Sequence, residues 1–377
     1  MNFCVPCLFG LEGLCADELR RLGMAGVNAK NGQVLFSGGE SDIARANINL
    51  RTGERVLLVA GETPANSFDE LYEGVRSMQW EMHIPADGAF PVKGHSLNSK
   101  LQSIPSCQKI IKKAVVERLK AMHKCELLNE TGAKRQIQFA IMDDVATLYI
   151  DTSGAGLHKR GYRPVGSAAP LRETLAAAIV KLSRYKGREP VFDPFCGSGT
   201  IPIEAALAAL NRAPGLYRAS ATGNRNAPGF ASQSWDRPSA KDWETAITEA
   251  QDREFKGSYE IRGSDIDPKC VEIAAENARR AGVSGHIRFE TADAASFRSE
   301  APAGTIMANP PYGERVMEKY EAEEIYRKFG TAVRNLGGWK MYILSSHTGF
   351  ERAFGKTAAK KRKLYNGMLK CDLYMYY

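Results

Sequence analysis

The sequence predicts an α/β protein whose C-terminal domain is built on an open parallel sheet and whose N-terminal half is α+β. Three observations lead to this fold class. The apolar run Val191-Phe192 is followed by a glycine-containing turn over residues 193–200 and then by helical periodicity. A second apolar run, residues 305–308, ends at Asn309-Pro310-Pro311-Tyr312. Strands that alternate with helices indicate a parallel sheet, and 377 residues allow two or three domains.

The stretch Asp193-Pro194-Phe195-Cys196-Gly197-Ser198-Gly199-Thr200 is predicted to join a strand to a helix. Two glycines one residue apart permit a tight turn and leave no side chain between the helix N-terminus and a docked ligand. The backbone N–H groups of the turn would then face that ligand. An ordinary strand-to-helix turn has the same pattern, so the glycines alone leave both interpretations open.

Asn309-Pro310-Pro311-Tyr312 is expected at the carboxyl end of a later strand. Ligands of open α/β sheets bind just beyond such ends, so this tetrapeptide and the glycine turn are expected to share one crevice. Proline cannot continue a central strand and restricts the residue before it. Two prolines in succession therefore predict a rigid, extended backbone with its carbonyl groups held outward.

Residues 1–64 are predicted to form a ferredoxin-like module. The expected elements, in order, are a strand (3–9), a helix (11–22), a hairpin (27–37) with a turn signal at Lys30-Asn31-Gly32, a helix (41–51) and a strand (56–59). The order βαββαβ is that of ferredoxin-like folds. Because this scaffold serves several functions, it assigns none by itself.

Residues 65–160 are predicted to form a second module that ends in a hinge. The expected elements are helices over 69–78 and 108–124 and strands over 136–142 and 145–151. The second helix has an apolar stripe, and its opposite face carries Lys109, Lys112 and Lys113. Such a basic face is either simply solvated or contacts the phosphates of a nucleic acid.

The hinge, residues 154–163, is basic and punctuated by glycine, and Pro164 ends it. Its cations Lys159, Arg160 and Arg163 are candidates for contact with RNA that crosses from one half of the chain to the other. Packing of the joint between the halves is an equally good explanation of these residues.

The C-terminal half, residues 161–377, is predicted to continue the α/β pattern. Helices are expected over 171–183, from Thr200, from Pro268 to Gly282 and over 323–336, with strands over 259–264, 287–289 and 341–345. An acidic residue is usual about 20 positions after the glycines of a dinucleotide site, but here the next strand comes much later. Residues 212–237 are therefore interpreted as an ordered insertion near the mouth of the site or as a surface loop.

Two carboxylates in Asp265-Ile266-Asp267-Pro268 are expected to have separate roles. Asp267 precedes a proline at the first position of a helix, so it is predicted to be the N-cap. Asp265 follows a strand, where an acidic residue accepts hydrogen bonds from ribose hydroxyls in dinucleotide sites. Further along, Lys360, Lys361 and Arg362 belong to a basic run, which is either a solvated edge or a contact for phosphates.

Taken together, these motifs resemble the class I S-adenosylmethionine-dependent methyltransferases that modify exocyclic amino groups of bases through an Asn-Pro-Pro-Tyr motif. The closer resemblance is to the bacterial THUMP-domain (RlmL-like) 23S rRNA guanine-N2 methyltransferases, and it extends over essentially the whole chain. It rests on the glycine turn, the Asn-Pro-Pro-Tyr turn and the stretches Gly154–Arg163, Ala169–Ala176 and Lys363–Gly367.

The resemblance implies a Rossmann-like methyltransferase domain over 161–377 and a THUMP-like RNA-binding domain with its hinge over 65–160. The residues it implies for S-adenosylmethionine are Thr174, Leu175, Asp193, Pro194, Phe195, Cys196, Gly197, Ser198, Gly199, Thr200, Asp265, Ile266, Asp293, Ala294 and Asn309. The catalytic residues it implies are Asn309, Pro310, Pro311 and Tyr312. The candidate RNA contacts are Lys109, Lys112, Lys113, Lys159, Arg160, Arg163, Lys360, Lys361 and Arg362.

Composition and charge agree with this class of protein. The chain is 44% hydrophobic and 25% charged, no apolar run approaches the length of a membrane span, and residues 1–4 lack the pattern of a signal peptide. A cytoplasmic protein without a membrane partner is expected. The net charge of +8 favours a polyanionic partner. The eight cysteines are scattered, and Cys4-Val5-Pro6-Cys7 has no second pair, so no metal is expected.

The preferred prediction is methylation of guanine N2 in 23S rRNA. Guanine N2 in tRNA, or adenine N6 in RNA or DNA, would use the same tetrapeptide. A nicotinamide dehydrogenase would leave Asn309 without a role, and a non-catalytic RNA-binding assembly factor would not need a cofactor crevice. Because every cofactor motif lies in residues 161–377, that part alone is expected to bind S-adenosylmethionine.

Overall fold

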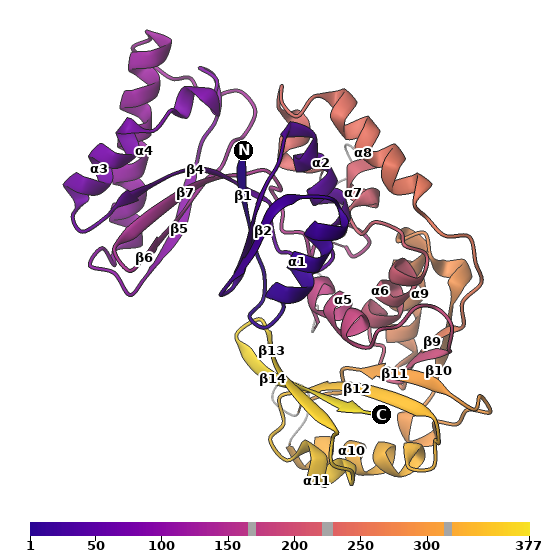
Figure 1. Cartoon of the computed structure of the whole chain (residues 1–377). Coiled ribbons are helices and arrows are strands. Elements are labelled where there is room, and N and C mark those ends of the chain that lie inside the picture. The colour runs from indigo at the N-terminus through magenta and orange to yellow at the C-terminus, as the bar shows by residue number, and fades with distance from the viewer. Residues whose placement is uncertain (165–170, 221–228, 313–318) are drawn as a thin grey trace.

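The computed structural model describes residues 1–164, 171–220, 229–312 and 319–377. Two seven-stranded sheets organise the chain, one in the N-terminal half and one in the C-terminal half (Figure 1). The predicted fold class is confirmed. Residues 169 and 170 of the stretch 169–176 lie outside the described ranges.

The N-terminal sheet has the strand order β2-β3-β1-β4-β7-β6-β5. Its strands are β1 (Asn2–Pro6), β2 (Ala25–Lys30), β3 (Gln33–Ser37), β4 (Leu57–Pro64), β5 (Val92–Leu97), β6 (Ile137–Met142) and β7 (Val145–Asp151). Its helices are α1 (Glu12–Arg21), α2 (Glu40–Asn49), α3 (Phe68–Ser77) and α4 (Ile104–His123), with the 3₁₀ turn η1 (Trp80–Met82). The predicted βαββαβ order of the first 64 residues is confirmed.

Strand β4 joins the two N-terminal modules. It is longer than the expected strand over 56–59, and it pairs with β1 on one side and with β7 on the other. The two modules therefore share one continuous sheet and one apolar core. Strand β5 was not predicted, because it is an edge strand whose side chains alternate between half-buried and exposed and so lack an apolar run.

The C-terminal sheet has the order β10-β9-β8-β11-β12-β14-β13. Its strands are β8 (Val191–Asp193), β9 (Ile261–Asp265), β10 (Ile287–Thr291), β11 (Gly304–Ala308), β12 (Trp339–Ser345), β13 (Lys360–Asn366) and β14 (Leu369–Tyr376). The strands from β10 to β12 are parallel, whereas β14 is antiparallel to both of its neighbours. The order reverses between β8 and β11, and ligands of open α/β sheets bind at such a point.

Helices cover both faces of this sheet. They are α5 (Glu173–Leu182), α6 (Thr200–Ala209), α9 (Pro268–Arg280), α10 (Lys319–Val333) and α11 (Phe350–Phe354), with 3₁₀ turns η3 (Ser284–His286) and η4 (Ala294–Ser296). Figure 1 shows α5, α6 and α9 on one side and α10 and α11 on the other. Strand β11 is buried on both faces of the sheet. Met307 packs into the core on the side of α5, α6 and α9, and Ile306 and Ala308 pack into the core on the side of α10 and α11.

The insertion after α6 packs against the N-terminal half. Its elements are α7 (Leu216–Ser220), η2 (Ala231–Ser234) and α8 (Ala240–Asp252), and α7 and α8 lie beside α2 (Figure 1). Phe230 stacks on Trp243 at 5.3 Å between ring centroids, and the Trp235 indole N–H donates to the Lys134 carbonyl at 3.0 Å. The predicted place near the mouth of the site is therefore wrong for the described part, because these aromatic rings belong to the N-terminal core.

Three further findings bear on the sequence predictions. Within the described ranges, every helix falls short of the length or the apolar character that a membrane span requires. All eight cysteines are free thiols. In the same ranges, no group of three or more His, Cys, Asp or Glu side chains is arranged to hold a metal ion.

Candidate cofactor and substrate site

The candidate site lies at one edge of the C-terminal sheet. Strands β10, β9, β8 and β11 are parallel neighbours, so their carboxyl ends meet at this edge. Asp193 and Asp265 are the last residues of β8 and β9, Asp293 comes two residues after β10, and Asn309 directly follows β11. The topology thus brings the glycine turn and the Asn-Pro-Pro-Tyr turn to the same edge, as the spacing in the sequence predicted.

The two glycines in the turn after β8 differ in the space around them. Both have positive φ angles, +51° at Gly197 and +81° at Gly199. A Cβ atom on Gly199 would lie 2.9 Å from the Ala274 Cβ, whereas a Cβ atom on Gly197 would meet no atom within 4 Å. Gly199 therefore allows α6 to pack against α9, and Gly197 leaves an open surface in the turn that precedes α6.

Asp265 borders this open surface. Its Oδ2 accepts a hydrogen bond from the Gly197 N–H at 2.9 Å, and its Oδ1 accepts one from the Asp267 N–H at 3.1 Å. The remaining lone pairs of this half-buried carboxylate suit ribose hydroxyls. Asp267 instead accepts from the Lys269 N–H at 2.9 Å, so the predicted N-cap of α9 is confirmed.

We expect substitutions of the two carboxylates to have different effects. Asp265→Ala should weaken S-adenosylmethionine binding roughly 10- to 100-fold, because a hydrogen bond to a charged group is worth about 1.5–3 kcal/mol. Asp267→Ala should retain the affinity and lower stability by about 1 kcal/mol. Calorimetric titration and thermal melting measure the two effects. Unchanged affinity in the first variant with a large loss in the second would reverse the assignment.

Other residues of the glycine turn are buried and stabilise the turn. Asp193 is 2% exposed, and its Oδ1 accepts from the Phe195 N–H at 3.1 Å. Burial, with a smaller contribution from the charge of Asp265, raises the pKa of the Asp193 carboxyl well above its usual value. Cys196 is buried, and its N–H donates to the Ser264 carbonyl at 2.9 Å. These contacts hold the turn against β9 and do not face the open surface.

Residues that the resemblance implies for the cofactor also lie at the ends of β9 and β10. Ile266 is 69% exposed next to Asp265 and presents apolar surface. Asp293 is exposed, and its Oδ1 accepts from the Ala295 N–H at 2.8 Å. Ala294 is different, because it is buried in the core under α10. Its side chain therefore supports the fold.

The N-terminus of α5 departs from the prediction. Thr174 and Leu175 are fully buried, and the Thr174 hydroxyl donates to the Glu54 Oε1 at 2.6 Å. Burial alone raises the pKa of Glu54, but hydrogen bonds from His158 and Thr174, with the nearby charge of Arg172, bring this pKa below its usual value. The Thr174 and Leu175 side chains have no surface for a cofactor in this conformation. Instead, Thr174 connects α5 to the N-terminal half, and Leu175 packs into the core of the methyltransferase domain.

The Asn-Pro-Pro-Tyr turn is held by two hydroxyl groups. The Tyr326 hydroxyl of α10 donates to the Pro311 carbonyl at 2.5 Å, and the Tyr312 hydroxyl donates to the Asn309 Oδ1. Burial raises the pKa of Tyr312 well above its usual value, so this hydroxyl keeps its proton at neutral pH.

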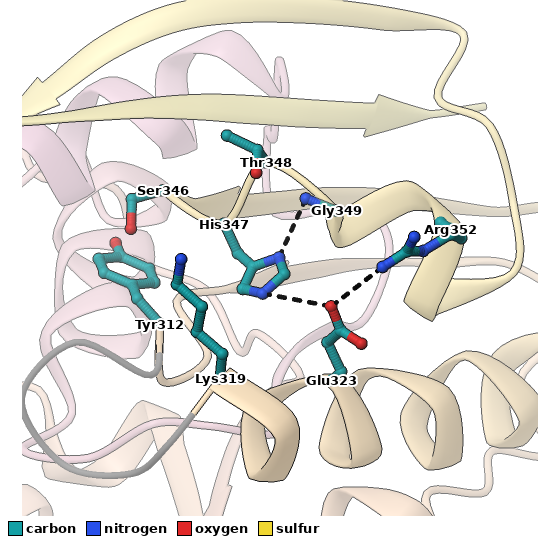
Figure 2. Close-up of a pocket in the computed structure, with 8 residues that line it drawn as sticks. All are labelled: Tyr312, Lys319, Glu323, Ser346, His347, Thr348, Gly349 and Arg352. Atoms are coloured by element: carbon teal, nitrogen blue, oxygen red, sulfur yellow. Dashed lines mark hydrogen bonds and ion pairs between the residues drawn. The ribbon is translucent and has the colours of Figure 1, made fainter.

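A pocket of about 550 Å³ opens beside Tyr312 (Figure 2). It is lined by Tyr312, Lys319, Glu323, Ser346, His347, Thr348, Gly349 and Arg352. Apart from Tyr312, none of these residues was predicted from the sequence. A usable signal was present, because the polar run 346–349 directly follows the apolar strand β12, whose carboxyl end lies at the same sheet edge as Asn309.

Two predicted RNA contacts are wrong. The Arg160 guanidinium is buried, pairs with the Glu204 carboxylate at 3.2 Å and donates to the Leu157 and Arg51 carbonyls at 2.8 and 2.6 Å. The Arg163 guanidinium, also buried, donates to the Leu171 carbonyl and to the Thr200 hydroxyl. Arg160 therefore packs the joint between the halves, which was the alternative explanation, whereas Arg163 packs within the C-terminal half. The Thr200 hydroxyl likewise points inward.

The other basic candidates differ in how available they are. Lys112 is engaged in contacts within the protein, since its Nζ pairs with Glu130 at 2.6 Å and lies 3.4 Å from the centre of the Phe90 ring. Arg362 is half-buried and donates to the Gly10 carbonyl, and Lys361 pairs with Glu351 at 2.6 Å. The exposed side chains are Lys109, Lys113, Lys159 and Lys360, together with Lys361.

Models of known protein families match three consecutive parts of the chain. The RlmL ferredoxin-like domain matches residues 2–57, and the THUMP domain matches residues 65–151. The RMKL-like methyltransferase domain matches residues 160–375, which include the whole candidate site. The dehydrogenase alternative has no support in this match.

Individual relatives extend over the whole chain. "Putative RNA methyltransferase YpsC" of Bacillus subtilis (strain 168) is 42% identical over 98% of this chain and 94% of that protein. "Ribosomal RNA large subunit methyltransferase K/L" of Psychromonas ingrahamii is 34% identical over 100% of this chain but 50% of that protein. The chain therefore spans about half the length of the K/L relative.

Solved structures show the same fold. A Listeria monocytogenes protein named as a predicted N6-adenine-specific DNA methylase has a TM-score of 0.92 at 42% identity, over 100% of this chain and 96% of that one. SMU.472, solved as a complex with SAH, has a TM-score of 0.92 at 38% identity, over 100% and 97% of the two chains. The chain belongs to the RMKL-like methyltransferase family, with an RlmL-type ferredoxin-like domain and a THUMP domain ahead of its methyltransferase domain.

Proposed function

We propose that the protein transfers a methyl group from S-adenosylmethionine to an exocyclic amino group of an RNA base, with guanine N2 of 23S rRNA as the preferred target. The observation that carries the proposal is the meeting of two turns at one sheet edge. Gly197 leaves an open surface after β8, and Asn309 follows the nearby strand β11. The relative solved with SAH supports the cofactor, and the K/L relative supports rRNA.

The residues at the edge fit the cofactor. The open surface at Gly197 suits its amino-acid end, Asp265 its ribose, and Ile266 with Asp293 its adenine. When bound, S-adenosylmethionine supplies a methyl group that its positive sulfur has already activated. The protein's task is therefore to position the acceptor and to stabilise the charge that develops on it.

Asn309 and Pro310 carry that task. The Asn309 Oδ1 and the Pro310 carbonyl are two acceptors for the two hydrogens of an exocyclic amine. Accepting those hydrogens draws the nitrogen lone pair out of conjugation with the ring and directs it toward the methyl donor. Tyr312 stacks on the base, which must be unpaired or flipped out of a helix to reach the site. No strong base is needed before transfer, because the nitrogen can lose its proton afterwards.

RNA binding is assigned to the THUMP module and to exposed lysines. Lys109 and Lys113 lie on α4, at the far side of the N-terminal half from the C-terminal sheet (Figure 1). Phosphate contacts by lysines supply affinity without choice of sequence. Choice of the target nucleotide therefore falls to the active site and to the shape of the RNA.

Reversing the charge of Lys109 and Lys113 should weaken RNA binding severalfold at every sequence. A plot of the logarithm of the binding constant against the logarithm of the salt concentration should also become shallower, by about one unit of slope per lost phosphate contact. Filter binding across a salt series measures both effects. Lys241→Glu, at an exposed position of α8, is the control. Equal loss in the control, or no loss in the double variant, would remove α4 from the RNA surface.

Adenine N6 is the second candidate target. Both bases offer an exocyclic amine, and the Listeria monocytogenes relative is named a predicted N6-adenine-specific DNA methylase. The THUMP match favours RNA over DNA. A purely structural role in ribosome assembly would leave the open surface at Gly197 and the Asn-Pro-Pro-Tyr turn without a use.

The class of RNA can be tested with labelled S-adenosylmethionine. The intact protein is incubated with 23S rRNA and with tRNA purified from a strain that lacks the gene, and Asn309→Ala serves as the inactive control. Label in 23S rRNA is expected. Label in tRNA alone would redirect the proposal, and label in neither RNA would overturn it.

A further inference from the structure

The pocket beside Tyr312 contains polar groups that the assignments above do not use. Figure 2 shows Glu323 and His347 side by side in it, with Lys319 and Arg352 around them. Glu323 comes from α10, and His347 comes from the loop between β12 and α11. The pocket therefore joins the Asn-Pro-Pro-Tyr turn to two other elements of the C-terminal domain.

His347 directs an N–H group toward Glu323. Its side chain is only 7% exposed, and its Nδ1 accepts a hydrogen bond from the Gly349 N–H at 3.0 Å. A nitrogen that accepts carries no proton, so the neutral ring is protonated on Nε2. Among the described residues, Nε2 has no hydrogen-bond partner. It lies 3.6 Å from the Glu323 Oε1, which is longer than a hydrogen bond.

Glu323 presents an acceptor next to this donor. Its side chain is 24% exposed, and its Oε1 pairs with the Arg352 guanidinium at 3.3 Å. Its Oε2 makes no hydrogen bond with any residue in the described ranges. Tyr326 connects the pair to the catalytic turn: its ring lies edge-on to His347 at 5.7 Å, and its hydroxyl donates to the Pro311 carbonyl.

We propose that Glu323 and His347 read the Watson–Crick edge of a guanine whose amino group lies at Asn309. In this arrangement the Glu323 carboxylate accepts from guanine N1–H, and the His347 Nε2–H donates to O6. The proposal rests on the proposed function, since it names the base at that same site. Lys319 and Arg352, whose side chain is 81% exposed, are placed to receive the phosphate of the same nucleotide.

The order of donors and acceptors along the base explains why this site would prefer guanine to adenine. Guanine presents its amino group, then the N1–H donor, then the O6 acceptor along one edge, which complements an acceptor followed by a donor. Adenine presents its amino group and then N1, an acceptor that would face the Glu323 carboxylate. Two acceptors in contact leave a desolvated group unpaired, and sites of this kind discriminate strongly.

Nucleotide binding tests the readout apart from catalysis. Inosine 5′-monophosphate keeps N1–H and O6 but lacks the amino group, so it cannot be methylated at N2. By saturation-transfer NMR in the presence of S-adenosylhomocysteine, it should bind the full-length protein roughly tenfold or more tightly than adenosine 5′-monophosphate. Guanosine 5′-monophosphate should bind at least as well. Equal binding of inosine and adenosine nucleotides, or binding of neither, would overturn the proposal.

Two variants distinguish loss of base recognition from a general loss of structure. Glu323→Gln should lower the preference for the inosine nucleotide about tenfold with unchanged S-adenosylhomocysteine binding. Glu324→Gln is the matched control, because Glu324 is the next residue on α10 and pairs with Arg327 and Lys328 instead. An equal effect in the control would contradict the proposal. The wild-type ranking decides the matter even if a variant fails to fold.

Methyl-transfer products show which proposal has failed. N2-methylguanosine formed by an enzyme that binds inosine and adenosine nucleotides equally would remove the base readout alone. N6-methyladenosine, together with tighter binding of the adenosine nucleotide, would remove the guanine target and the readout together.

Discussion

Asn309→Ala is expected to lose methyl transfer by about 10²–10³-fold while it binds S-adenosylmethionine normally. In the proposed mechanism, the Asn309 Oδ1 is one of two preorganised acceptors for the amine, and loss of one such contact commonly costs this much in rate. The fold should persist, because Asn309 is only half-buried and follows β11 at the sheet edge. Single-turnover assays on the RNA substrate, with a parallel cofactor titration, measure both quantities.

Tyr312 variants serve as controls for this prediction. Tyr312→Phe keeps the ring for stacking and removes the hydroxyl that donates to the Asn309 Oδ1, so its turnover should stay within severalfold of the wild-type value. Tyr312→Ala should lose turnover and base binding together. Near-normal transfer by a folded Asn309→Ala protein would mean that another group holds the amine, and the exocyclic-amine mechanism would be wrong.

Glu204→Ala is expected to destabilise the whole protein by about 3–5 kcal/mol. Glu204 and Arg160 form an ion pair whose side chains are 0% and 2% exposed, and removal of one partner leaves a buried charge uncompensated. Burial opposes the charge on Arg160, but the neighbouring carboxylates Glu204 and Glu173 and the Tyr162 phenol raise the pKa of this guanidinium, which stays protonated. Denaturant unfolding measures the loss.

The exposed ion pair between Arg21 and Asp17 is the control for that measurement. Its side chains are 74% and 43% exposed, so Asp17→Ala should change the free energy of unfolding by less than about 1 kcal/mol. A loss no larger in Glu204→Ala than in Asp17→Ala would show that the joint between the halves does not depend on the buried pair.

The same joint changes the expectation for residues 161–377 alone. The described part of the insertion contributes Phe230, Trp235 and Trp243 to the N-terminal core, and Leu11 of the N-terminal half packs into the methyltransferase core. Lys181 of α5 also pairs with Glu18 of α1 at 3.0 Å. A chain cut at residue 161 would expose this apolar surface, so we now expect it to aggregate instead of binding cofactor as an independent domain.

Local patterns predicted the parts of the site that lie within one strand–turn–helix unit. The cap at Asp267, the glycine turn and the position of Asn309 at a strand end follow from neighbouring residues, and the structure has them at one edge of the sheet. The turn between β13 and β14 likewise lies at Asn366-Gly367, a pair typical of hairpin turns. Propensity and periodicity act over such short distances, so they are readable in a sequence.

Contacts between distant segments could not be predicted in this way. Glu54 accepts from Thr174, Arg160 pairs with Glu204, and Glu323 faces His347. A basic residue in a glycine-punctuated stretch has the same local pattern whether it meets RNA or a buried carboxylate. Only tertiary packing distinguishes these cases. It buries Arg160 between the two halves and Arg163 within the C-terminal half, so both are structural instead of RNA-binding.

Nucleoside mass spectrometry of RNA methylated in vitro tests the central claim most directly. The intact protein is incubated with S-adenosylmethionine and with 23S rRNA from a strain that lacks the gene, and the rRNA is then digested to nucleosides. The account predicts one new product, N2-methylguanosine, which is absent when Asn309→Ala replaces the wild-type protein. N6-methyladenosine, or a methyl group on a ring carbon or on a ribose, would contradict it.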